Sequence, residues 1–213
     1  MGFVGKILFL TNSTILKVLG HSHSTREMPY LKYLTLQKEK TEDLERRNKW
    51  LTHEYESKIL DFKKYFQEIF PELINKNESI LCVGARTGQE VVALKELGWV
   101  NSIGIDLVPY EPNVIFGDMH DLPFESASYS AVFTNSFDHS LRPLKFLEEV
   151  YRVLKPEGIF VLHVLFNRPN DMFGVTDIYS KRAFRKLLKD FIILQERKSK
   201  LFSLNYLFIL KKV

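Results

Sequence analysis

An apolar stretch that runs into a glycine-bearing turn constrains this chain more than any other feature. Residues 80–83 (Ile-Leu-Cys-Val) have the pattern of a buried strand, Gly84 and Gly88 bracket a turn, and a helical pattern begins at Gln89. Glycine lets a backbone approach a ligand closely, and the first turn of a helix offers unpaired N–H groups. Asp106 ends a second apolar stretch 22 residues after Gly84, which suits a carboxylate that binds ribose hydroxyls. The arrangement predicts a pocket for a nucleoside-containing cofactor, and the plainer alternative is an ordinary strand–turn–helix of an α/β domain.

The composition is that of a globular protein. A chain of 213 residues suits one domain with an extension, and 45% hydrophobic and 13% aromatic residues allow a substantial core. The single cysteine, Cys82, excludes an intramolecular disulfide and a cysteine-based zinc cluster, and we expect no metal site. One cysteine fits a reducing compartment, so we expect a cytoplasmic protein.

Charge is distributed unevenly along the chain. Residues 79–140 carry two basic side chains against eight acidic ones, whereas residues 181–213 carry ten basic side chains against two acidic ones. A basic segment of that kind suits phosphate groups or an anionic membrane surface, and lysines that keep the surface soluble are the plainer alternative. The formal net charge of +4 is too small to indicate a nucleic-acid partner by itself.

Residues 1–77 are expected to form a helical N-terminal extension or lid. The apolar stretch from Phe3 to Leu19 is interrupted by two lysines and a polar run, whereas a spanning helix needs about 20 mostly apolar residues. It also lacks the pattern of a signal peptide, and it suits an arm that packs on the domain, on a partner protein or on a membrane surface. Residues 20–40 are polar, and we expect them to be irregular in structure. A helical pattern extends from Thr41 to Phe70 and ends at Pro71.

After Ser79 the patterns of strand and helix alternate, which predicts a parallel sheet with crossover helices. The expected strands are Ile80–Val83, Ser102–Asp106, Val114–Phe116, Ala131–Thr134 and Gly158–Val164, and the expected helices are Gln89–Leu97, Leu144–Leu154 and Ser180–Leu188. The chain ends differently, with two strand patterns at Phe191–Gln195 and Asn205–Leu210 and no helix between them. This ending predicts an antiparallel hairpin added to the parallel sheet.

Five motifs in this order and spacing resemble the class I S-adenosylmethionine-dependent methyltransferases, in the branch of small domains similar to the quinone-biosynthesis enzymes. They are Val83–Gly88, Asp106, Gly117–Phe124, Phe133–His139 and Leu154–Gly158. The resemblance covers residues 78–213. It implies an α/β, Rossmann-like sheet of seven strands, mostly parallel with an antiparallel C-terminal strand and helices on both faces, and it implies S-adenosyl-L-methionine as the cofactor.

The resemblance also assigns roles to single residues. The turn of Gly84, Ala85, Arg86 and Gly88 would lie against the methionine part and the ribose, together with Asn135. Asp106 would accept hydrogen bonds from the ribose hydroxyls, and Leu107 would pack on the adenine ring. Asp118 would accept from the adenine amino group, with Met119 beside the ring. The alternatives are a loop cap for Asp106, a turn cap for Asp118, and ordinary core positions for Leu107 and Met119.

Two residues depart from the family pattern. Cys82 stands where an acidic residue is common, and Arg86 stands at the middle glycine of the turn. Arg86 must direct its side chain away from the ligand or use it on a carboxylate. These departures favour one competing hypothesis, a vestigial cofactor-binding scaffold.

His139 and Asp138 follow the fourth predicted strand, at the edge where an open α/β sheet places its ligand. A methyl transfer to oxygen usually needs a base near neutral pKa, and His139 is the first candidate for that base or for a substrate contact. Capping of a helix that starts near Leu141 is its alternative role. The motifs for methylation of nucleobases and of protein arginine are absent, so a small-molecule, lipid or sugar acceptor is expected. An RNA methyltransferase and a nicotinamide dehydrogenase are less favoured alternatives.

Overall fold

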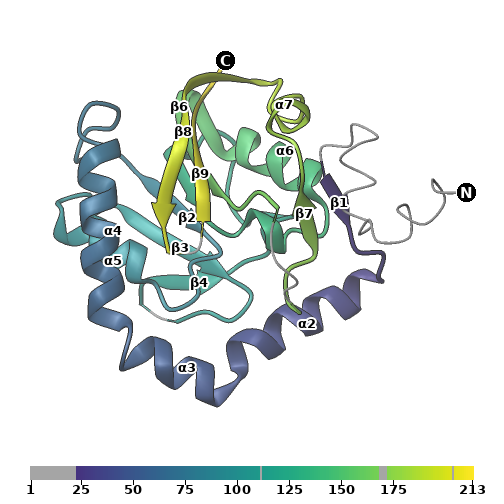
Figure 1. Cartoon of the computed structure of the whole chain (residues 1–213). Coiled ribbons are helices and arrows are strands. Elements are labelled where there is room, and N and C mark those ends of the chain that lie inside the picture. Colours follow the sequence, from purple (N-terminus) through teal and green to yellow (C-terminus); the bar gives the residue numbers. More distant parts are fainter. Residues whose placement is uncertain (1–22, 111, 168–171, 203) are drawn as a thin grey trace, which may run out of the picture.

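The computed structural model describes residues 23–110, 112–167, 172–202 and 204–213 (Figure 1). A seven-stranded sheet in the order β4-β3-β2-β5-β6-β9-β8 forms its centre. All neighbouring strands pair in parallel except β9, which is antiparallel to both β6 and β8. The strands are β2 (Ile80–Val83), β3 (Ser102–Asp106), β4 (Val114–Phe116), β5 (Tyr129–Thr134), β6 (Leu154–Val164), β8 (Phe191–Leu201) and β9 (Leu204–Lys212). The predicted fold class and the C-terminal hairpin are both confirmed.

Helices cover both faces of the sheet, because successive strand residues point to opposite sides. On one face, Leu81, Val132 and Leu162 pack with α6 (Pro143–Val153) and the short α7 (Lys181–Phe184). On the other face, Cys82, Phe133 and Val161 pack with α4 (Tyr55–Ile69) and α5 (Gln89–Glu96). Cys82 is fully buried in this second core. The helix expected over Ser180–Leu188 is a single turn, followed by hydrogen-bonded turns up to Phe191.

The N-terminal region is more ordered than its sequence pattern predicts. Residues 20–40 were expected to be irregular, but β1 (His23–Thr25) pairs antiparallel with β7 (Thr176–Ile178), and α2 spans Tyr30–Glu42. The single helix expected over Thr41–Phe70 is instead divided into α3 (Leu44–Leu51) and α4. The arm at residues 3–19 lies outside the described residues. Within the described part of the chain, no helix has the length and apolar character needed to cross a membrane.

The strand order places a ligand-binding edge at the centre of the sheet. The chain proceeds from β2 to β3 and β4 on one side, and β5 then returns to pair with the other side of β2. Such a reversal opens a crevice beyond the carboxyl ends of the strands. In Figure 1, α2 and α3 run across this edge of the sheet.

Candidate functional site

The turn after β2 is held tightly against β3. The backbone N–H groups of Gly84 and Ala85 both donate to the carbonyl of Ile105 at 3.0 Å. Gly84 has a φ of +76°, and a Cβ there would lie 2.7 Å from the Ser136 hydroxyl oxygen. Glycine is therefore required at position 84, both for the left-handed backbone and for the approach of β5.

Arg86 also adopts a positive φ, of 49°, which is unusual for a residue with a side chain. Its guanidinium carbon lies 4.1 Å from the ring centroid of Trp50, on α3. Burial lowers the pKa of this guanidinium, and the carboxylates of Glu90 and Asp106 raise it. The long side chain thus reaches α3, and it also lines the cavity next to the turn.

The carboxylate of Asp106 is oriented by two backbone donors at the end of β3. The N–H of Arg86 donates to Oδ2 at 3.0 Å, and the N–H of Val108 donates to Oδ1 at 3.1 Å. Burial raises the pKa of this carboxyl, although both hydrogen bonds favour its ionised form. Each oxygen retains capacity to accept a further hydrogen bond, as a ribose diol requires.

Asp118 takes part in a buried hydrogen-bond network beside β4. Its Oδ1 accepts from the backbone N–H of His120 and from His120 Nδ1, each at 2.9 Å, and its Oδ2 accepts from the hydroxyl of Tyr30. Burial alone would raise the pKa of Asp118, but these hydrogen bonds outweigh it and lower the pKa. His120 itself is buried, with only 3% of it exposed.

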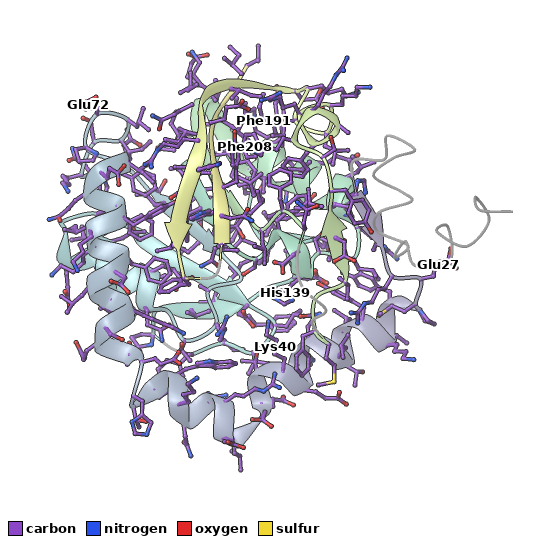
Figure 2. All side chains as sticks on the ribbon, in the orientation of Figure 1. Glu27, Lys40, Glu72, His139, Phe191 and Phe208 are labelled. Carbon is purple, nitrogen blue, oxygen red and sulfur yellow. The ribbon has the colours of Figure 1, made fainter. Side chains whose placement is uncertain are left out.

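His139 lies between α2 and the segment before β7, and Figure 2 shows Lys40 of α2 beside it. Its Nδ1 donates to the carbonyl of Phe173 at 3.1 Å, which leaves Nε2 to accept from Lys40 Nζ at 2.7 Å. Burial lowers the pKa of His139 to about 4, partly offset by the negative charge of Asp138. In this conformation the lone pair of His139 is occupied by the lysine.

These groups surround a cavity of about 50 Å³, which has room for a few water molecules. Seven residues that the sequence indicated line it: Gly84, Arg86, Asp106, Leu107, Asp118, Met119 and His139. Of the other candidates among the described residues, Ala85, Gly88, Asn135 and Asp138 are not part of the lining. The donors and the close approach at Gly84 suit a nucleoside cofactor, but the free space is far below the roughly 300–1,000 Å³ of ligand pockets.

Sequence reasoning missed the side of the cavity that α2 forms. Tyr33, Gln37 and Thr41 all line the cavity and are buried. Their four-residue spacing places them on one helix face. That spacing was the available signal, but two of the three residues are polar and do not register as an apolar stripe.

Comparison with known proteins supports this description. Residues 81–162 match the family model described as a methyltransferase domain. A comparison with curated protein sequences gives no match.

Solved structures with the same fold are numerous. A protein from Pyrococcus horikoshii OT3 is 20% identical, with 76% of this chain and 92% of that chain covered and a TM-score of 0.60. The 1,6-didemethyltoxoflavin-N1-methyltransferase of Burkholderia thailandensis, solved with S-adenosylhomocysteine, is 14% identical over 89% and 94% of the two chains, with a TM-score of 0.65. A chain from a Haloferax volcanii complex of a methyltransferase activator and a methyltransferase is 17% identical over 74% and 90%, with a TM-score of 0.60. At these identities the likeness shows the fold. The fold and the match over residues 81–162 make this chain similar to methyltransferase domains.

Proposed function

We propose that the protein transfers a methyl group from S-adenosyl-L-methionine to a small molecule bound beneath α2. The observation that carries the proposal is the geometry of Asp106. Its carboxylate stands at the end of β3, is oriented by two backbone donors and faces the cavity beside the Gly84 turn. A ribose diol is the natural partner of a carboxylate so placed.

The proposal gives the other residues of the cavity their roles. Asp118 and Met119 would hold the adenine, and Leu107 would pack on its ring. Gly84, Ala85, Gly88 and Asn135 would lie along the methionine part, and Arg86 is available for its carboxylate. The bound cofactor supplies a methyl group on a sulfonium, so the main task of the protein is to align a nucleophile with it.

The acceptor would bind where α2 meets the carboxyl ends of β5 and β6. Gln37, Lys40 and His139 line the cavity on that side. We propose His139 and Asp138 as acceptor-side residues. For His139 to act as a base, Lys40 must first leave its Nε2.

The toxoflavin-precursor enzyme and a geranyl diphosphate methyltransferase among the structural neighbours act on small molecules, which favours that class of acceptor here. One structural neighbour, the Haloferax volcanii protein, was solved in complex with an activator protein. If this chain binds a protein partner, the arm at residues 3–19 is the proposed contact.

Calorimetric titration with S-adenosylhomocysteine tests the proposal directly. We expect the intact protein to bind it, and we expect Asp106→Ala to lose at least tenfold in affinity while keeping its circular dichroism spectrum. Asp190→Ala, which changes an exposed aspartate between α7 and β8, is the matched control and should bind normally. Absence of binding by the folded wild-type protein would contradict the proposal, and equal binding by Asp106→Ala would contradict the site.

A further inference from the structure

The carboxylate assigned to adenine is already occupied by the protein itself. Two of the hydrogen bonds to Asp118 come from His120, and both go to Oδ1. Oδ2 accepts from the hydroxyl of Tyr30, in the first turn of α2. A carboxylate offers about four acceptor positions, so three of them are taken, and the Tyr30 hydroxyl is bonded to the one oxygen that accepts nothing from His120.

Tyr30 also lies next to the shared wall of two hollows. Gly117 and Asp118 line both the cavity of about 50 Å³ and a second hollow of about 750 Å³. Tyr30 lines the second hollow, and its helix neighbour Tyr33 lines the first. An adenine ring that reaches Asp118 must therefore take space at this boundary.

The ring of Tyr30 is held independently of its hydroxyl. The guanidinium carbon of Arg142 lies 4.2 Å from the ring centroid, and the rings of Tyr33 and His120 lie at 5.4 Å and 5.6 Å. Removing only the hydroxyl should leave the ring in place, because these contacts involve its faces and edges. The hydroxyl also lies 2.9 Å from His120 Nδ1, so its removal separates both of these polar contacts from the effect of packing.

We propose that the Tyr30 hydroxyl occupies, on Asp118, the place of the cofactor's adenine amino group, and that cofactor binding displaces it. Tyr30 is in this sense an internal competitor that lowers cofactor affinity and couples cofactor binding to release of the first turn of α2. The proposal rests on the assignment of Asp118 to adenine made above.

The test compares two ligands on two proteins by calorimetry. The ligands are S-adenosylhomocysteine and S-inosylhomocysteine, which presents an oxygen in place of the amino group. Tyr30→Phe should bind S-adenosylhomocysteine about tenfold more tightly than the wild type, because a hydrogen bond to a charged group no longer has to be broken. It should gain less than about twofold for S-inosylhomocysteine. Tyr151→Phe, which removes a hydroxyl bonded to the carbonyl of Val213 far from the cavity, should change neither affinity.

Each other result decides against the inference. Weaker binding of S-adenosylhomocysteine by Tyr30→Phe would mean that the hydroxyl belongs to the cofactor site. Equal gains for both ligands would mean that the variant only makes room, and no change would mean that the hydroxyl does not compete. Failure of the wild type and the variant alike to bind S-adenosylhomocysteine would refute the proposed function itself. The melting temperature of the unliganded Tyr30→Phe protein should fall, because the unliganded wild type is stabilised by the hydrogen bond between the Tyr30 hydroxyl and Asp118.

Discussion

Arg86 occupies a backbone position that usually falls to glycine. A non-glycine residue with a φ of 49° costs on the order of 1–3 kcal/mol. The stacking of its guanidinium on Trp50 at 4.1 Å and its attraction to Glu90 and Asp106 offset that cost. Arg86 thereby connects the turn after β2 to α3. Its neighbour Glu90 is a buried carboxyl.

Glu90 is 5% exposed, on the first turn of α5, and burial raises its pKa to about 7 despite the positive charge of Arg86. A carboxyl whose folded pKa lies above its unfolded value near 4.5 destabilises the fold as pH rises between those values. Glu90→Gln should therefore increase the free energy of unfolding by about 1–3 kcal/mol at pH 8, with little effect at pH 4.5. Urea unfolding at both pH values measures the difference. Glu96→Gln, an exposed change on the same helix, is the control, and an equal gain at both pH values would contradict the assignment.

At the scale of elements, α2 depends on polar contacts more than on apolar burial. Only Tyr33, Gln37 and Thr41 of its thirteen residues are buried. The Gln37 side chain donates to the carbonyl of Phe173 at 2.7 Å, and Lys40 donates to His139. An element held in this way opens more easily than the core of the sheet.

Removing the hydrogen bond between Gln37 and Phe173 should loosen α2 without unfolding the sheet. Gln37→Ala removes one of the two donors to the carbonyl of Phe173, which keeps the hydrogen bond from His139, at a cost of about 0.5–1.5 kcal/mol. We expect faster amide hydrogen exchange in residues 30–42 and 172–178, with exchange in β2, β5 and β6 unchanged. Thr35→Ala is the control, because Thr35 is exposed and bonds only within its own helix. Uniform acceleration across the sheet would show instead that α2 and the core open together.

The elements also show what sequence patterns can and cannot predict. The bounds of β2, β3 and β4 agree with their predictions, because each is a short apolar run between strong turn signals. The strands β8 and β9 run longer than predicted, since pairing extends them through polar residues such as Lys198. The helix α2 was missed because it buries polar side chains, and the break between α3 and α4 was missed because the apolar pattern continues across Thr52 and His53.

At the scale of the whole molecule, the sequence motifs predict the positions of single residues but not the contacts between distant segments. Asp106 and Asp118 lie at the ends of β3 and β4, where their motifs indicated. The contacts of Tyr30 with Asp118 and of Lys40 with His139 join residues about 90–100 positions apart. No local pattern encodes such pairs, because they depend on how α2 crosses the sheet edge and on the pairing of β1 with β7.

Two histidines should make the molecule sensitive to acid. Burial lowers the pKa of both His139 and His163 to about 4. His163 is fully buried and stacks on Tyr65 at 5.4 Å, and within the described residues neither of its ring nitrogens makes a hydrogen bond of good geometry. The backbone of Ser199 offsets only part of the effect of burial on its pKa. Since the unfolded chain binds these protons near pH 6.5, stability is present above that pH and is lost as pH falls toward 4. Glu90 acts in the opposite direction over part of this range, but the two histidines together outweigh it.

His163→Leu separates this contribution from the rest of the protein. The variant removes two unpaired buried nitrogens, so we expect a gain of about 1–2 kcal/mol in the free energy of unfolding at pH 7. The gain should grow as pH falls to 5, because leucine binds no proton in the unfolded chain. Urea unfolding at the two pH values measures both effects, with His53→Gln, a change of an exposed histidine, as the control. A loss of stability at pH 7 would show that His163 has a partner such as a buried water, and that the core beneath α4 requires its polar atoms.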